Sequence, residues 1–262
     1  MSRLFGAICN EPKRLHTALE PVRDVLVARG HFKGWGLGYA QGGEVLLKRN
    51  PRPTDVVDFY DALASVASDY IIMHADDPAT DHDAHTGNDN TQPFRYKKWL
   101  YAQAGAIDAF EEIKPALLDH IPEFMRRNIR GKTPAEHIFH VFLAFLHDAG
   151  VVMDHNLPLA QSRRALRDAL AMVFSLITRA GGTAGPGNIV VTNSRSMLAV
   201  RLGQPLHVRR FKQPGRDKGH EFRAVLIASE VTDPGEGFEE IPDRSVITVT
   251  RDLQIDIVPL EA

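Results

Sequence analysis

The pattern of hydrophobic and polar residues divides the chain into a strand-like first part, a helical middle and a strand-like last part. Short apolar runs and two-residue alternation predict five strands in the first part. They cover Leu4 to Cys9, Gly34 to Tyr39, Glu44 to Lys48, Tyr70 to His74 and Phe94 to Gln103. Two stretches between them, Leu15 to Arg29 and Asp55 to Ser68, are predicted to be helices, with Thr54 as a candidate N-cap for the second.

Apolar residues in the middle of the chain recur at helical spacing. The pattern covers Ile107 to Leu117, Ile138 to Ala149 and Leu166 to Ile177. Core packing explains the phenylalanine stripe within 138–146 and 170–177 better than an interaction surface does. The segment Gly181 to Gly187 then interrupts the helices as a loop or a phosphate cradle, but it lacks the Gly-Lys-Ser/Thr ending of a P-loop.

Strand-like periodicity returns in the last third of the chain. It predicts strands at Asn188–Thr192, Met197–Arg201, Leu206–Arg210, Phe222–Ser229, Val246–Thr250 and Leu253–Val258. The order of strands, then helices, then strands differs from the regular alternation of βαβ units. It favours an α+β fold in which antiparallel sheets carry segregated helices.

Composition narrows the class of protein. The 262 residues carry a net charge of -2, and the basic pairs Arg126-Arg127 and Arg209-Arg210 are expected on solvated faces, so no nucleic acid or membrane partner is expected. Cys9 is the only cysteine, which excludes an intrachain disulfide. No apolar run approaches the ~20 residues that span a bilayer, and the N-terminus lacks the apolar region of a signal peptide. We expect a soluble cytoplasmic protein.

Five short segments, read together and in order, resemble motifs of class II glutamine amidotransferases. The segments are Met1–Gly6, Gly34–Gly38, Asn90–Phe94, Trp99–Gly105 and Val225–Glu230, the last followed by Ile241-Pro242. The corresponding family motifs read Met-Cys-Arg-Leu-Phe-Gly, Gly-Trp-Gly, Asn-Thr-His-Pro-Phe, a strand that ends in His-Asn-Gly, and Val-Ile-Ala-Ser-Glu. The resemblance implies an N-terminal-nucleophile fold, a four-layer αββα sandwich with two stacked antiparallel sheets between helical layers. It implies a single domain over residues 1–262.

The resemblance also implies a mechanism whose side chains are mostly changed here. In the family an N-terminal cysteine attacks the side-chain amide of glutamine, and its own α-amine serves as the base. This chain has Ser2 at the nucleophile position, and a hydroxyl is far less acidic than a thiol and depends more on its base. Ser2 has a free amine only if Met1 is removed. Cys9 lies within the first predicted strand and is expected to be a buried core residue, not a replacement nucleophile.

The substrate-binding and oxyanion positions implied by the resemblance are substituted as well. The arginine that holds the substrate carboxylate corresponds to Asp76 when counted from His74, and to Asp77 when counted back from Ala79. Either residue would place an anion against that carboxylate, which repels it. The oxyanion asparagine corresponds to Ala104, which has no side-chain donor, although the backbone N–H of Gly105 remains.

Two more family positions differ. Gln92 replaces the histidine of Asn-Thr-His-Pro-Phe, and Pro134 replaces the second aspartate of Gly-Asp-Thr-Asp-Ser-Glu. Around Pro134 only Gly131, Thr133 and Glu136 match, and Glu136 has an alternative interpretation as a residue of the first turn of a helix. Several functional positions are thus changed while scaffold positions match.

The polar segment from Ala75 to Pro93, which directly follows His74, is predicted to be a loop. Imidazoles and carboxylates are concentrated there, at His74, Asp76, Asp77, Asp81, His82, Asp83, His85 and Asp89. Such groups bind transition metals, but their spacing matches no metal motif that we recognise. A solvated polar loop is the favoured interpretation, and we expect no metal and no cofactor.

These observations lead to three hypotheses. The leading one is an amidotransferase-fold protein without glutaminase activity that acts as a binding, regulatory or structural partner of another protein and that forms homo-oligomers. The alternative is an active amidohydrolase that uses Ser2 as an N-terminal nucleophile on a glutamine-like or other amide, with Asp76 and Asp77 selecting a cationic or neutral substrate. The third is a metal-dependent role for the loop from His74 to Asp89.

Because the scaffold positions match, the substituted site is predicted to remain a pocket. Ser2, Gln92 and Gly105 are expected to converge at the end of one sheet, near the turn at Asp76 and Asp77. The potential of this pocket is predicted to be negative, since no residue of the nearby motifs restores the lost positive charge. Glutamine is then expected to bind poorly.

Overall fold

The computed structural model describes residues 2–77, 87–154, 159–215, 220–231 and 237–260. Its larger sheet has seven strands in the order β13-β11-β12-β1-β6-β3-β4. These strands are β1 (Arg3–Cys9), β3 (Gly34–Gln41), β4 (Glu44–Asn50), β6 (Tyr70–Asp76), β11 (His207–Pro214), β12 (Glu221–Ala228) and β13 (Phe238–Glu240). Each neighbouring pair is antiparallel, so the start of β1 lies beside the end of β6, with Arg3 opposite Ala75.

The second sheet has six strands in the order β15-β14-β10-β9-β8-β7, again all antiparallel. Its strands are β7 (Phe94–Tyr96), β8 (Trp99–Ala104), β9 (Asn188–Thr192), β10 (Met197–Arg201), β14 (Ser245–Val249) and β15 (Ile255–Pro259). The two sheets stack on a shared apolar core to which Leu4 and Ile72 contribute from the first sheet and Val190 and Ile247 from the second. Strands buried on both faces are expected to be continuously apolar, and the run Ile189-Val190-Val191 in β9 follows that rule.

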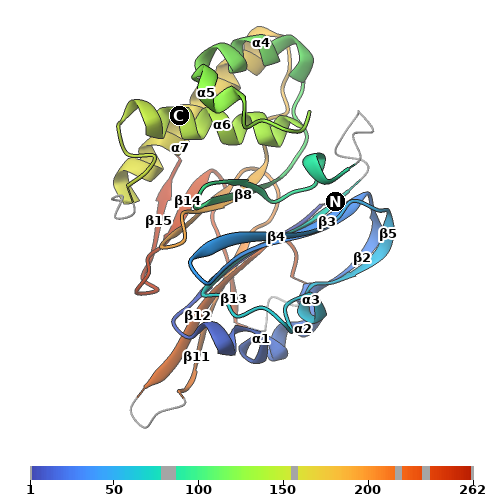
Figure 1. Ribbon diagram of the computed structural model, residues 1–262, viewed down its shortest axis with the longest axis vertical. Coiled ribbons are helices and arrows are strands. Elements are labelled where there is room, and N and C mark those ends of the chain that lie inside the picture. Colours follow the sequence, from blue (N-terminus) through green and yellow to red (C-terminus); the bar gives the residue numbers. More distant parts are fainter. Residues whose placement is uncertain (1, 78–86, 155–158, 216–219, 232–236, 261–262) are drawn as a thin grey trace.

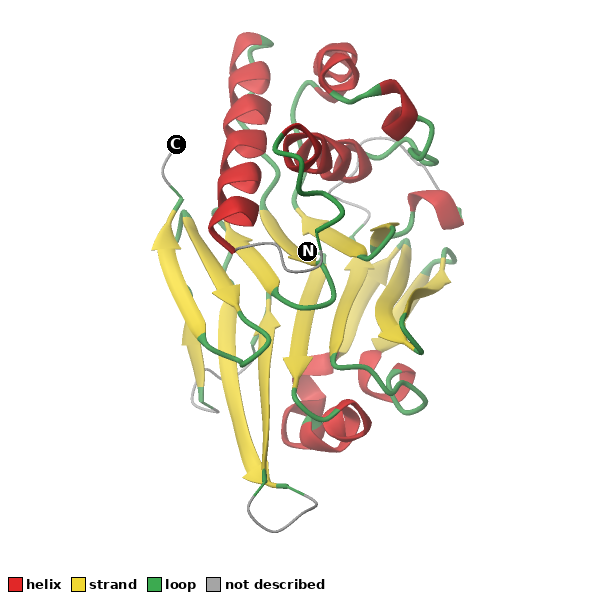
Figure 2. Ribbon diagram, turned by 60° about the vertical axis from the view of Figure 1, so that its left-hand side comes forward, coloured by secondary structure: helices red, strands yellow, loops and turns green. Residues whose placement is uncertain are grey.

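Helices cover the outer face of each sheet (Figures 1 and 2). The six-stranded sheet packs against four helices: α4 (Phe110–His120), α5 (Glu123–Arg126), α6 (Pro134–Asp148) and α7 (Leu159–Arg179). The seven-stranded sheet packs against α1 (Leu15–Ala18), α2 (Arg23–Leu26), α3 (Phe59–Ala62) and a small sheet of β2 (Val27–Phe32) and β5 (Thr54–Asp58). The αββα sandwich expected from the resemblance is confirmed. Phe139 and Phe142 of the phenylalanine stripe point from α6 into the core between the helices and the six-stranded sheet, as expected for core packing.

Two predicted helices were wrong. Leu15 to Arg29 forms only short helical turns around Pro21 and becomes strand β2 at Val27, because proline lacks the N–H that a continuous helix needs. Asp55 to Ser68 begins as strand β5, which pairs with β2, and only Phe59–Ala62 is α-helical. Thr54 is part of that strand, and the cap of α3 is Asp58, whose carboxylate accepts from the N–H of Asp61 at 2.8 Å.

Other boundaries shift locally. Phe94 to Gln103 forms two strands of a hairpin instead of one, with Lys97 at φ 53° in the turn. The predicted loop from Ala75 to Pro93 begins later, because β6 extends to Asp76, and it contains a 3-10 turn at Asn88–Asn90. Among the described residues, no helix combines the length and the apolar character needed to cross a membrane.

Candidate active site

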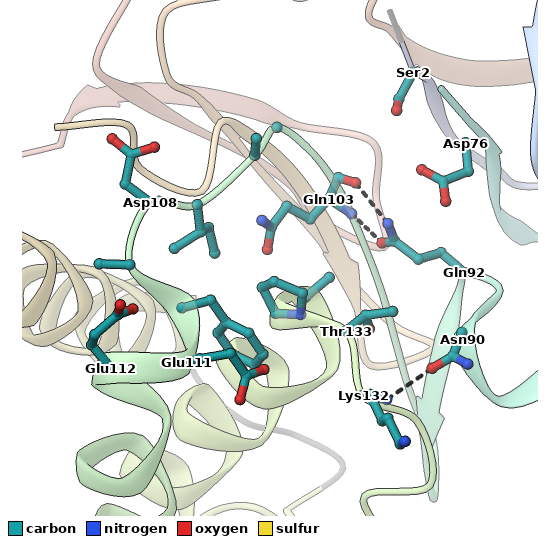
Figure 3. A pocket seen from close by; sticks show the side chains of 17 residues that line it. Ser2, Asp76, Asn90, Gln92, Gln103, Asp108, Glu111, Glu112, Lys132 and Thr133 are labelled. Atoms are coloured by element: carbon teal, nitrogen blue, oxygen red, sulfur yellow. Dashed lines mark hydrogen bonds between the residues drawn. The ribbon is translucent and has the colours of Figure 1, made fainter. Parts of the chain in front are cut away.

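A cavity of about 360 Å³ lies where the start of β1 meets the ends of β6 and β8 and the first turn of α6 (Figure 3). Ser2 and Asp76 reach it from the seven-stranded sheet, and Gln92 and Gly105 reach it from the loops that flank β7 and β8. Pro134 completes the wall from α6. The structure thus brings these residues together, but at the ends of both sheets, so the expectation of a single sheet end was wrong.

Ser2 stands between this cavity and a second one of about 460 Å³, since it lines both together with Gly105. The residue is 7% exposed, and its Oγ accepts a hydrogen bond from the backbone N–H of Asp77 at 3.0 Å. The carboxylate of Asp77 acts on Arg3, where it opposes the lowering of the arginine pKa that burial causes. Asp76, by contrast, lines the first cavity, so of the two candidate aspartates Asp76 faces the site.

Gln92 holds the end of strand β8 in place. Its Oε1 accepts from the backbone N–H of Gln103 at 2.7 Å, and its Nε2 donates to the carbonyl oxygen of the same residue at 2.9 Å. The side-chain amide therefore continues the hydrogen-bond ladder of the sheet. Its Nε2 also lies 3.4 Å from Nε2 of His74, a fully buried imidazole whose pKa burial lowers to about 3, so His74 is neutral at pH 7.

Two glycines permit the close approach of backbone segments at this wall. A Cβ on Gly36 would lie 2.1 Å from the carbonyl oxygen of Gln92, and a Cβ on Gly105 would lie 2.5 Å from the carbonyl oxygen of Pro186. Ala104 precedes this contact and lines the second cavity. The matched glycines of the motifs therefore have a packing role that is independent of catalysis.

The glycine-rich segment 181–187 is a loop held by Asp108. The Asp108 carboxylate accepts hydrogen bonds from the backbone N–H groups of Thr183 at 2.9 Å and Ala184 at 2.8 Å. The backbone N–H of Asp108 donates to the carbonyl oxygen of Ala184. A phosphate cradle needs such N–H groups to face an anion. Here an internal carboxylate occupies two of them, which favours the loop over the phosphate cradle.

Glu136 fixes the loop that enters α6. Its carboxylate accepts from the backbone N–H groups of Arg130 at 3.0 Å and Gly131 at 2.6 Å, and Thr133 caps the helix by accepting from the N–H of Glu136. Burial raises the pKa of Glu136, while these two hydrogen bonds act in the opposite direction. Glu136 is thus a residue of the first helical turn with a structural role, and Pro134 beside it presents no charge to the cavity.

The cavity lining includes four carboxylates and one ammonium group. They belong to Asp76, Asp108, Glu111, Glu112 and Lys132. Lys132 lies between the matched Gly131 and Thr133, so the expectation that no motif residue supplies positive charge was wrong. Sequence reasoning also missed the three acidic residues on and before α4 and the Gln103 amide. The carboxylates still outnumber the ammonium group, which favours a cationic ligand over an anionic one.

The remaining candidates lie elsewhere. Cys9 is buried in β1, and burial raises the pKa of its thiol to about 12, so it is no substitute nucleophile. Of the proposed metal cluster, Asp81, His82, Asp83 and His85 lie outside the described residues. Within the described ranges, no group of three or more histidine, cysteine, aspartate or glutamate side chains is arranged to hold a metal ion.

Known proteins share this architecture. Residues 1–221 match the family model of class II glutamine amidotransferases. The glutamine aminotransferase class-II domain protein from Silicibacter pomeroyi superposes with a TM-score of 0.63 at 17% identity, covering 99% of this chain and 100% of that one. The predicted glutamine amidotransferase from Pseudomonas aeruginosa gives 0.60 at 14% identity, with 97% and 98% covered.

The glutamine phosphoribosylpyrophosphate amidotransferase of Bacillus subtilis, complexed with ADP and GMP, is similar to this chain with a TM-score of 0.61 at 14% identity. The match covers 99% of this chain but only 49% of that enzyme. No curated protein matches the sequence. At these identities the solved structures show a shared fold, and the family model covers most of the chain, so the chain belongs to the class II glutamine amidotransferase family.

Proposed function

We propose that this chain has kept the amidotransferase fold without glutaminase activity and acts as a binding, regulatory or structural partner of another protein. The observation that carries the proposal is the Asp76 carboxylate in the cavity, at the position where the family resemblance implies an arginine. Two like unit charges about 4 Å apart repel by roughly 4 kcal/mol at an effective dielectric constant of about 20. Asp76 is partly exposed, so solvent screens this repulsion to about 1 kcal/mol.

Losses at the oxyanion position support the same conclusion. Removing one preorganised donor from an oxyanion site costs roughly 10²–10³ in rate, and Ala104 has no side-chain donor. The amide of Gln92 is engaged by the backbone of Gln103 on both of its polar atoms, so it supports the wall of the cavity. The effects of residues that act together are not additive, and two such losses already remove useful catalysis.

The test is the release of glutamate from glutamine by the purified chain, with its N-terminus determined by intact mass. We expect release at the level of the buffer for the wild type and for Ser2→Cys, because a stronger nucleophile restores neither the carboxylate site nor the oxyanion donor. Ser2→Ala is the matched control. Release at a rate typical of enzymes that Ser2→Ala abolishes would overturn the proposal.

A second candidate function rests on the placement of Ser2 between the two cavities. In this alternative the Ser2 oxygen attacks the carbonyl carbon of an amide while the free α-amine takes the hydroxyl proton. The C–N bond then breaks, the α-amine returns the proton to the leaving amine, and water hydrolyses the ester. A protein that retains Met1 in the intact mass has no such base, and this result would exclude the alternative.

A further inference from the structure

A third cavity, of about 510 Å³, lies where the edge strands of the two sheets meet, and we call it the edge cavity. Strand β4 is the last strand of the seven-stranded sheet, β7 is the last strand of the six-stranded sheet, and both line the edge cavity. Helix α5 and the loop after it complete the walls. The charged side chains of the described lining are Arg49, Asp89, Arg95, Lys97, Arg130 and Glu136.

Two arginines join the edge strands beside this cavity. Arg49 of β4 donates from Nη1 to the carbonyl oxygen of Asn88 at 2.9 Å and from Nη2 to that of Pro93. Arg95 of β7 donates from Nη1 to the carbonyl oxygen of Val45 at 2.6 Å. All three acceptors are neutral backbone groups. The hydrogen bonds therefore hold both guanidinium groups in place without pairing their positive charges with a carboxylate.

The other two cations of the edge cavity are exposed. Nζ of Lys97 lies 5.6 Å from the ring centroid of Tyr96 and 3.1 Å from the sulfur of Met153, both of which are uncharged. The guanidinium group of Arg130 has no hydrogen-bond or ion-pair partner within the described ranges of the chain. Among the described residues, none of the four cations forms an ion pair with a carboxylate.

The two carboxylates of the lining offset only part of this charge. Four positive and two negative side chains leave a surplus of two positive charges in the described lining. The Glu136 carboxylate is also engaged by the backbone N–H groups of Arg130 and Gly131, which hold it against the loop. A cavity whose walls carry a surplus of one sign attracts ligands of the opposite sign, so the edge cavity favours an anion.

An exposed aromatic side chain borders the same cavity. Phe124 of α5 is 52% exposed, although it belongs to the lining. Its ring contacts that of His147 at 5.2 Å between the centroids, and more than half of its surface remains open to solvent. A single exposed phenylalanine is common on protein surfaces. Here it places apolar surface beside a cluster of cations, which suits a ligand that joins a flat ring to an anionic group.

Together these features define a ligand by its chemistry. We propose that the edge cavity binds a small organic phosphate with an aromatic ring, of the nucleotide class. The phosphate group lies among Arg95, Lys97 and Arg130, and the ring packs on Phe124. A phosphate monoester carries a charge of about −1.5 to −2 at pH 7, which matches the surplus of two positive charges.

The type of cation and the size of the cavity fit this ligand class. Three of the four cations are arginines, whose planar group donates two parallel hydrogen bonds to phosphate oxygens. A volume of about 510 Å³ lies within the range of small-molecule sites. The edge cavity shares no described lining residue with the first cavity, so the proposal does not depend on what happens at Ser2.

The test is isothermal titration of the full chain at pH 7 with adenosine monophosphate, adenosine and inorganic phosphate. We expect adenosine monophosphate to bind about tenfold more tightly than either of the other two probes, because it alone carries both the phosphate and the ring. Raising the salt concentration from about 0.05 M to about 0.5 M is expected to weaken it roughly tenfold, since salt screens exposed charges.

Three variants locate the site. Arg130→Gln removes a charge whose group has no described partner to lose, and we expect about tenfold weaker binding of adenosine monophosphate. Arg127→Gln makes the same change at an exposed residue outside the cavity, which pairs with Glu123 at 2.6 Å, and is expected to keep the wild-type affinity. Phe124→Ala is expected to weaken adenosine monophosphate about fivefold and to leave inorganic phosphate unchanged.

Lys97→Gln, at a second exposed cation, is expected to weaken binding in the same direction and keeps the test decisive if Arg130→Gln fails to fold. Equal affinities for adenosine monophosphate and adenosine would overturn the proposal, because the phosphate would then contribute nothing. Wild-type affinity in both Lys97→Gln and Arg130→Gln would place the ligand elsewhere and also overturn it. Tighter binding of a single-stranded oligonucleotide than of adenosine monophosphate would overturn the assignment to a small molecule.

Discussion

Lowering the pH from 7 to 4.5 is expected to destabilise the chain through two buried histidines, His74 and His140. His74 lies in β6 against Gln92, and Nδ1 of His140 in α6 lies 2.9 Å from the carbonyl oxygen of Glu136. Burial lowers the pKa of His74 to about 3 and that of His140 to about 4, against about 6.5 for an ordinary histidine. Both imidazoles are therefore neutral in the folded chain over most of this range.

The direction of this pH effect on stability depends on whether the unfolded or the folded chain takes up protons at the higher pH. Below about pH 6.5 the unfolded chain takes up a proton on each of these histidines, and the folded chain does so only near pH 3 to 4. The stability that they contribute is fully present above about pH 6.5 and declines as the pH falls toward the folded-state values. At pH 4.5 the loss for His140 is roughly 2–3 kcal/mol, and the loss for His74 is of similar size.

The assay is urea unfolding at pH 7 and pH 4.5 for the wild type and His140→Phe. Phenylalanine retains the aromatic contacts that His140 makes with Tyr96 and Phe139 at 6.0 and 5.5 Å between ring centroids. We expect the difference in unfolding free energy between the two pH values to shrink by about 2 kcal/mol in His140→Phe. The control His220→Phe, at an exposed position, is expected to keep the wild-type difference. An equal difference in all three proteins would refute the reasoning.

Three further predictions concern the supports of the site. Asp108→Ala removes the acceptor of two backbone N–H groups in the segment 183–184, and we expect its thermal unfolding midpoint to lie about 3–6 °C below that of the wild type. The exposed control Asp119→Ala is expected to keep the wild-type midpoint. Gly105→Ala places a Cβ 2.5 Å from the carbonyl oxygen of Pro186 and is expected to cost about 1–3 kcal/mol in urea unfolding; a wild-type midpoint would show that the two segments separate freely. Cys9 is expected to resist a thiol reagent at pH 8 in the folded chain and to react fully in urea, since burial holds its thiol protonated; rapid labelling of the folded chain would contradict this.

Most strands could be predicted from the sequence because each carries its own apolar signal. The run from Ile189 to Val191 is buried on both sides, and its composition reflects that local environment. The pair β2 and β5 was missed because Val27–Phe32 and Thr54–Asp58 are largely exposed and carry no continuous apolar run, and they stabilise each other only once they pair. The paired residues of the two strands, from Phe32 and Thr54 to Val27 and Asp58, lie 22 to 31 positions apart, so their pairing leaves little trace in a local window.

In the candidate site, too, some residues could be placed from the sequence and others could not. Ser2, Gln92 and Gly105 could be placed near one another because their motifs fix the strand ends where they lie. The direction of the Gln103 side chain could not, because β8 is buried at every position and its sequence does not reveal which residue faces the cavity. Glu112 reaches the cavity only through the packing of α4, and Lys132 through the loop that Glu136 holds.

The central claim is that this cavity has lost the recognition of the glutamine carboxylate. Isothermal titration of the wild-type chain with glutamine tests it most directly. Loss of a charged partner typically costs about 2–5 kcal/mol, which turns micromolar binding into millimolar binding. We predict a dissociation constant in the millimolar range or weaker, and a micromolar constant would show that another cation serves the carboxylate and would contradict the account.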